Sequence, residues 1–90
     1  MSYALYSENG FVDDVATIGG WWVLIQEVAR VRSSGPLRKF LDDGRTTKIT
    51  EVLSDIDFVL PEIKDANTKR VLEGLKAGLQ KVKEVAIISG

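Results

Sequence analysis

Residues 13–32 read DDVATIGGWWVLIQEVARVR and include the longest uncharged apolar run of the chain, residues 15–25. Apolar side chains recur along this stretch at intervals of three and four residues, the period of an α-helix. A membrane-spanning helix needs about 20 apolar residues, and a signal peptide has basic residues where Asp13 and Asp14 stand. We therefore predict a buried helix over residues 13–32, with Asp13 or Asp14 as its N-cap, and no membrane segment.

Turn-forming residues divide the rest of the chain at residues 7–10, 33–36, 42–44 and 60–61. Between these breaks, the pattern predicts a short helix over residues 36–43 that Gly44 ends. It predicts a second, amphipathic helix that Thr46 or Thr47 caps and that runs to residue 60. A final helix is expected from about Asp65 onward.

The two terminal segments are ambiguous. Residues 3–6 and 85–88 carry β-prone side chains, so they could pair as a short antiparallel ribbon, or the last helix could continue to Ser89. Because a two-stranded ribbon alone is marginal in water, we expect a mostly α protein. The predicted fold is a compact bundle of three to four helices in a single domain over residues 1–90. The ribbon is a possible addition, and an α+β fold is the alternative.

The chain of 90 residues contains no histidine and no cysteine. Their absence excludes a thiol nucleophile, a histidine base, a Ser-His-Asp triad and a Cys/His zinc site. We therefore expect no enzyme and no cofactor. The lack of cysteine fits the reducing cytoplasm, and a net charge of −1 argues against nucleic acid as a partner.

The motif GGWW at residues 19–22 suggests a surface for another protein. Neighbouring residues on a helix point about 100° apart, so Trp21 and Trp22 cannot both face one core. Tryptophan is enriched at binding hot spots. Five of the seven aromatic residues lie within the first 22 positions, and we predict a partner or oligomer interface there: Tyr3, Tyr6, Phe11, Trp21 and Trp22. In the competing interpretation, the glycines simply admit large side chains within the core.

Residues 30–48 form the basic part of the chain. Arginine and lysine side chains next to hydroxyls and glycine amides are typical of a phosphate site, and a helix N-terminus near Thr46 would add its amides. The candidate anion-binding residues are Arg30, Arg32, Arg38, Lys39, Arg45 and Lys48. The alternative is that these cations are solvated or stabilise helix ends.

Charge alternates in blocks along the chain. Residues 1–29 and 49–67 each carry a net −4, whereas residues 30–48 carry +4 and residues 68–90 carry +3. Such blocks either pair within one subunit or guide association with a partner. Neighbouring carboxylates such as Asp55 and Asp57 do not converge on a helix, so we expect no metal site. The predicted function is a small non-enzymatic protein–protein interaction or assembly module that forms a homo-oligomer, of the kind that serves as a regulatory or inhibitory factor in bacteria and phages. The alternative is a binder of a phosphorylated ligand or RNA through residues 30–48.

Overall fold

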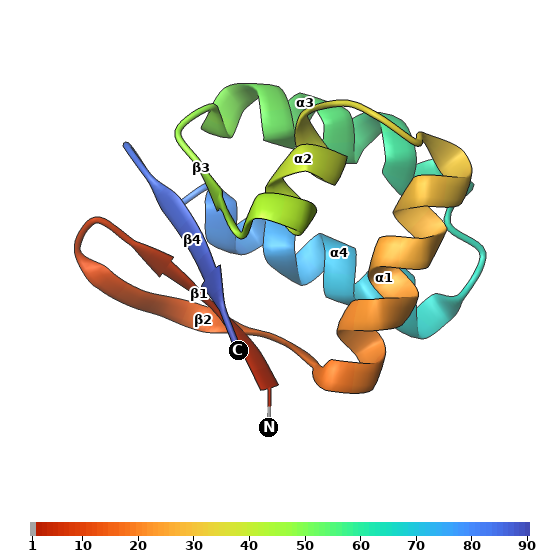
Figure 1. Ribbon diagram of the computed structural model, residues 1–90, viewed down its shortest axis with the longest axis horizontal. Helices are drawn as coiled ribbons and strands as arrows, with labels where there is room; N and C mark the ends of the chain where they lie inside the picture. Colours follow the sequence, from red (N-terminus) through yellow and green to blue (C-terminus); the bar gives the residue numbers. More distant parts are fainter. Residues whose placement is uncertain (1) are drawn as a thin grey trace.

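A computed structural model describes residues 2–90, and it is an α+β fold in which four helices lie on one side of an antiparallel sheet (Figure 1). The elements are β1 (Ser2–Ser7), β2 (Gly10–Thr17), α1 (Ile18–Val31), α2 (Pro36–Asp43), β3 (Arg45–Thr46), α3 (Ile49–Val59), the 3₁₀ turn η1 (Leu60–Glu62), α4 (Ala66–Leu79) and β4 (Ala86–Ser89). The strand order is β2-β1-β4-β3, so strands from the two ends of the chain lie together at the centre of the sheet.

The prediction of a mostly α bundle is wrong, because both terminal segments belong to a four-stranded sheet. The α+β alternative describes the chain, and the termini pair antiparallel with Leu5 opposite Ile88. A hairpin adds β2 on the far side of β1, and β3 adds two residues beside β4. Two further strands and a covering layer of helices give this ribbon the support that a two-stranded ribbon lacks in water.

The predicted helix over residues 13–32 begins five residues too early. Residues 13–17 belong to β2, and α1 begins at Ile18 with Thr17, not an aspartate, as N-cap; its Oγ1 accepts a hydrogen bond of 3.1 Å from the amide of Gly20. The register of β2 against β1 shifts twice, which leaves Val12 and Val15 without opposite residues. Each β-bulge adds one residue to the two-residue alternation. Apolar side chains then recur at intervals of three, which imitates a helix.

The other three helices agree with the sequence pattern. Helix α2 begins at Pro36, and Gly44 ends it in the left-handed conformation with φ of +72°. Helix α4 begins after Asp65, whose carboxylate accepts a hydrogen bond of 2.8 Å from the amide of Thr68. Helix α3 differs in one detail, since Lys48 occupies the N-cap position and no side chain caps it.

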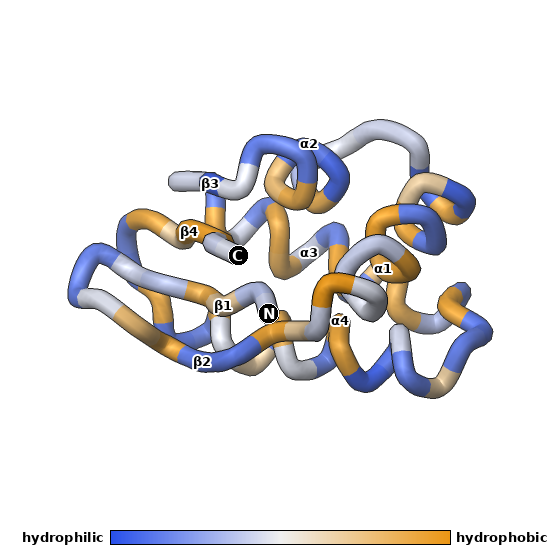
Figure 2. The backbone as a smooth tube through the Cα atoms, turned by 60° about the horizontal axis from the view of Figure 1, so that its bottom comes forward, coloured by the Kyte–Doolittle hydropathy of each residue, from blue (hydrophilic) through white to orange (hydrophobic). Residues whose placement is uncertain are grey.

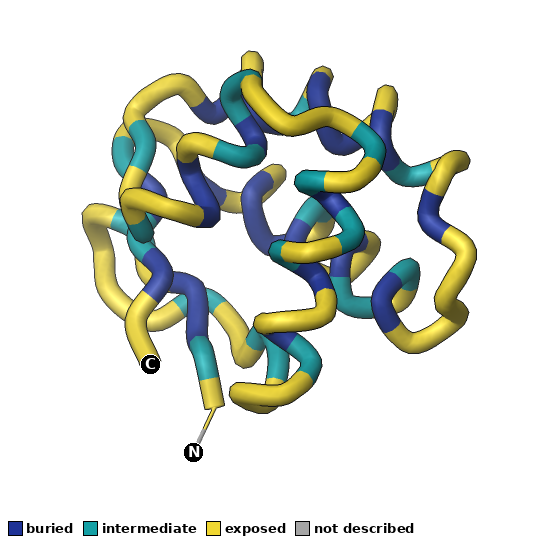
Figure 3. The backbone as a smooth tube through the Cα atoms, turned by 45° about the vertical axis from the view of Figure 1, so that its right-hand side comes forward, coloured by how far each residue is buried: buried dark blue, intermediate teal, exposed yellow. Residues whose placement is uncertain are grey.

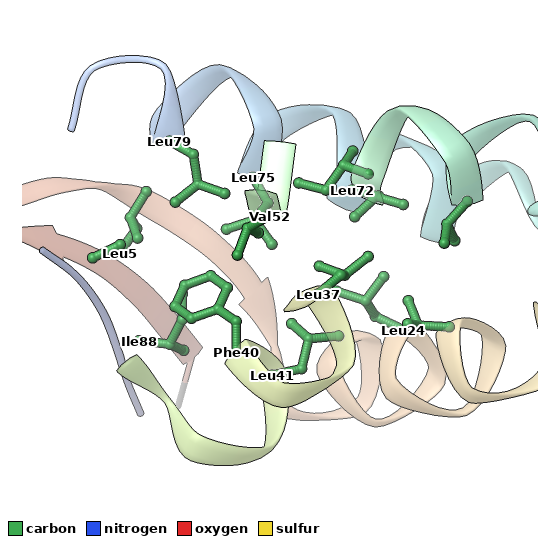
Figure 4. Packing of buried hydrophobic residues seen from close by; sticks show 14 of the residues in the cluster. Leu5, Leu24, Leu37, Phe40, Leu41, Val52, Leu72, Leu75, Leu79 and Ile88 are labelled. Atoms are coloured by element: carbon green, nitrogen blue, oxygen red, sulfur yellow. The ribbon is translucent and has the colours of Figure 1, made fainter. Parts of the chain in front are cut away.

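The core lies between the sheet and the helices. Figure 4 shows Leu5 of β1 and Ile88 of β4 among the side chains of α2, α3 and α4. Helix α4 passes close to β1 at Gly78, where an added Cβ would lie 2.7 Å from Cδ2 of Leu5. Buried positions alternate with exposed ones along every helix, and hydrophobic positions do the same (Figures 2 and 3). Each helix therefore has one covered side and one open side.

Candidate interaction surfaces

The two adjacent tryptophans have different surroundings. Trp21 is 4% exposed, and its ring stacks on Tyr3 at a centroid distance of 4.8 Å and an interplanar angle of 19°. Trp22 is 56% exposed. The sequence predicts both tryptophans and Tyr3 in one interface. The structure assigns Tyr3 and Trp21 to one internal stack and leaves Trp22 in contact with solvent.

Trp22 lies within a small apolar surface at the start of α1. Ile18 and Val23 of the same helix are also exposed, at 40% and 42%; together with Trp22 they form what we call the α1 patch. An added Cβ at Gly19 would meet no atom within 4 Å, so nothing covers the helix there. A cleft of about 390 Å³ borders the patch, and Trp22, Ile25 and the end of α2 line it. An exposed tryptophan beside a cleft is the usual form of a protein-binding hot spot.

One side of the sheet faces away from the helices (Figure 1), and exposed apolar side chains form a second apolar surface there. Tyr6 and Phe11 contact each other edge to face at a centroid distance of 5.8 Å, and they are 36% and 60% exposed. Ile87 of β4 lies opposite Tyr6 and is partly exposed. We call Tyr6, Phe11 and Ile87 the outer sheet face. The predicted interface is therefore divided, because the α1 patch and the outer sheet face lie near opposite ends of β2.

Three of the six candidate anion-binding residues are held within the protein. Arg30 pairs with Glu27 at 3.1 Å, and Arg38 pairs with Asp42 at 3.1 Å. Arg32 pairs with the carboxylate of Asp55 at 3.1 Å. The pairs of Arg30 and Arg38 join neighbouring turns of one helix and are largely exposed, so they contribute little to stability, whereas Arg32 pairs with a buried carboxylate of another helix.

The other three candidate residues gather around one cleft. Lys39, Arg45 and Lys48 line a hollow of about 410 Å³ between α2 and the start of α3, together with Thr46 and Thr47. Lys39 has a distant partner in Asp43 at 3.8 Å, and both side chains are exposed, so this pair contributes little to stability. A second cleft of about 550 Å³ shares Lys39 and Lys48 with the first and is also lined by Arg38, so four of the six candidate cations border two neighbouring clefts.

Asp55 is a buried carboxylate whose structural role the sequence does not predict, because the pattern presents Asp55 and Asp57 only as a possible metal-binding pair. It is 5% exposed; its Oδ2 accepts a hydrogen bond of 3.0 Å from the amide of Leu37 at the start of α2. Its Oδ1 pairs with Arg32 at the end of α1. Asp55 thus ties three helices together, and its only signal in the sequence is its place on the apolar side of the third helix. Asp57 points elsewhere and pairs with Lys76 at 2.6 Å.

Three carboxyl groups with a lowered pKa are explained by structural contacts. The pKa of Glu8 is lowered by its own amide and by those of Val85 and Lys83, which join the hairpin to the segment before β4. The pKa of Glu27 is lowered by the hydrogen bond from Arg30. Asp65 has a lowered pKa because the amide and the hydroxyl of Thr68 donate to it. These shifts reflect turns and helix ends, where ionised carboxylates are stabilised.

Within residues 2–90, no three acidic side chains gather closely enough to hold a metal ion, and no helix has the length and apolar character needed to cross a membrane. No family model, curated protein or solved structure matches the chain. The surfaces described above are therefore what any functional argument has to rest on.

Proposed function

We propose that this protein is a small non-enzymatic interaction module that works in the cytoplasm and binds a second copy of itself or another protein. The observation that carries the proposal is that the side chain of Trp22 is 56% exposed, whereas that of the adjacent Trp21 is only 4% exposed. Tryptophan side chains of monomeric proteins are mostly covered on average. An exposed one within an apolar patch and beside a cleft supports a protein-binding role.

The arrangement of the α1 patch adds to this support. Ile18 and Trp22 are one helical turn apart, so their side chains lie next to each other, and Val23 extends the exposed apolar surface about 100° further around the helix. Gln26 and the acidic end of α2 border this surface with polar groups. An apolar centre with a polar rim is the usual anatomy of a protein interface.

Photo-crosslinking tests this role directly. A photoreactive phenylalanine analogue is placed at position 22, and a matched analogue at position 58, where Phe58 is an equally exposed aromatic at 59% that lies against the guanidinium of Arg32. We expect a discrete crosslinked species from position 22 in cells that express the protein, and none from position 58. Equal yields from both positions would contradict the proposal.

A second candidate function rests on the cleft around Lys39, Arg45 and Lys48. Three cations beside the N-terminus of α3 could bind a phosphorylated ligand or RNA. Titration with inorganic phosphate and with a short single-stranded RNA at low and high salt tests it. Binding that weakens steeply with salt, and that the substitution Lys48→Glu removes, would support this function. If calorimetric titration at low salt shows no heat of binding for either ligand, this function is excluded.

A further inference from the structure

One row of side chains crosses the outer sheet face from edge to edge. The register places Phe11 of β2 opposite Tyr6 of β1, Tyr6 opposite Ile87 of β4, and Ile87 opposite Arg45 of β3. Residues that lie directly opposite in antiparallel strands point to the same side of the sheet. The flanking residues Leu5 and Ile88 point the other way and are buried in the core. The row is therefore aromatic at one end, apolar in the middle and cationic at the other end.

The two edges of this face carry opposite charges. Asp14 of β2 is opposite Ala4, two residues along β1 from Tyr6, and therefore lies on the outer side, whereas Asp13 is opposite the buried Leu5 and belongs to the inner side. Arg45 lies on β3 at the other edge. Asp14 and Arg45 are both exposed, and neither of them forms an ion pair with another residue in 2–90. Three strand spacings, about 14 Å, separate the two edges, so the charges cannot neutralise each other within one copy.

We propose that the outer sheet face binds the same face of a second copy, around a two-fold axis that runs parallel to the strands. This axis turns the row around, so that the acidic edge of each copy lies over the basic edge of the other. Arg45 then covers the ring of the partner's Phe11 and reaches the partner's Asp14, while Tyr6 packs on the partner's Ile87. A guanidinium over an aromatic face and next to a carboxylate is a favourable arrangement.

Other ways to join two copies are less favourable. Pairing β2 edge to edge with its own copy in antiparallel register would bring Asp13 and Asp14 next to the same residues of the partner. The bulges at Val12 and Val15 also interrupt the ladder of that strand. A two-fold axis across the strands would stack acidic edge on acidic edge. Only the axis along the strands brings unlike charges together.

The expected dimer is weak, because the face is small. Four strands at about 4.8 Å spacing and four to six residues of length give on the order of 300 Å² of flat area per copy. Stable interfaces bury about 800 Å² per partner, so we expect a dissociation constant of roughly 10–100 µM. This inference rests on the proposed function: it names a second copy of the chain as the partner and the outer sheet face as the surface that binds it.

Sedimentation velocity of the full chain from micromolar to millimolar concentration tests the dimer. We expect a monomer–dimer equilibrium that Phe11→Ser weakens by roughly tenfold or more. Phe58→Ser removes an equally exposed aromatic outside the face and should leave the equilibrium unchanged. Circular dichroism checks that each variant is folded.

A charge exchange identifies the geometry. Arg45→Glu and Asp14→Arg should each weaken the dimer several-fold, and the double variant should recover most of the loss, because the exchanged charges meet again across the axis. Recovery also separates this role of Arg45 from phosphate binding in the nearby cleft, which Asp14→Arg would not restore.

Three results would overturn the inference: a monomer at every concentration, a dimer that Phe11→Ser does not weaken, or no recovery in the double variant. If Trp22→Ser abolishes the dimer and Phe11→Ser does not, the copies join through the α1 patch. The inference then fails while the proposed function stands. The opposite outcome is also distinguishable. If position 22 gives no crosslink while the charge-exchanged double variant recovers the dimer, the inference stands and the α1 patch has no part in the proposed function.

Discussion

The two sides of the sheet differ in what they contribute to the protein. On the inner side, Leu5 is fully buried and packs against α4, whereas its neighbour Tyr6 is 36% exposed on the outer side. The same division separates Trp21 from Trp22 on α1, which leads directly out of β2. In both pairs a single step along the chain changes a core residue into a surface residue. A buried side chain that stabilises the fold and a side chain that is free to meet a partner therefore occupy adjacent positions, which substitutions can separate.

The largest difference is expected between the tryptophans. Trp21→Ala should lower the free energy of unfolding by about 3–5 kcal/mol, because it leaves a cavity beside Tyr3. Trp22→Ala should change it by less than about 0.5 kcal/mol, as a surface substitution. Urea denaturation followed by circular dichroism measures both. Similar losses in the two variants would show that Trp22 is covered in solution.

A somewhat smaller contrast is expected on β1. Leu5→Ala should cost roughly 2–5 kcal/mol, since a fully buried leucine is truncated. Tyr6→Ala should cost at most about 1.5 kcal/mol, the contribution of its edge-to-face contact with Phe11. Denaturation at low protein concentration keeps any association out of this measurement. A loss at Tyr6 as large as that at Leu5 would mean that the outer face is part of the core.

The glycines of α4 sharpen the comparison from the helix side. An added Cβ at Gly74 meets no atom within 4 Å, so Gly74→Ala should stabilise the protein by about 0.5–1 kcal/mol. At Gly78 the same methyl group would collide with Leu5, and moving a packed side chain costs about 1–3 kcal/mol. We therefore expect Gly78→Ala to be destabilising. Thermal unfolding of the two variants decides the point, and stabilisation in both would contradict a tight contact between α4 and β1.

The smallest effect concerns the N-cap of α4, the helix that covers the inner side of the sheet. The pKa of Asp65 is lower in the folded than in the unfolded chain, because Thr68 donates to its carboxylate. Ionised Asp65 therefore stabilises the fold above its unfolded pKa, and this contribution is lost as the pH falls through the folded pKa.

Asp65→Asn keeps an oxygen that can cap the helix but removes the titration. We expect the melting temperature of the natural chain to exceed that of the variant at neutral pH, and the gap to close in acid. A gap that does not change between about pH 7 and about pH 2 would exclude this contribution of Asp65.

Much of the helical part of this fold can be predicted, because its signals are local. Pro36, Gly44 and Asp65 mark helix ends through bonds that close within a few residues, and all three lie where the pattern places them. The first helix is misjudged at its start, where bulges give a strand the spacing of a helix. The candidate interface is only partly predictable, because periodicity shows that two adjacent tryptophans diverge but not which one meets the core.

The sequence by itself determined the approximate positions of the helices, the ends of α2, the cap of α4 and which chemistries are excluded by the missing histidine and cysteine. Only the tertiary structure decided that the two ends of the chain pair, that Trp21 is covered and Trp22 is not, and that Arg45 joins an aromatic row across the sheet. The physical reason is the range of the interactions. Helix and cap hydrogen bonds join residues at most about four positions apart, whereas a strand obtains its hydrogen bonds and its covered side from partners remote in sequence.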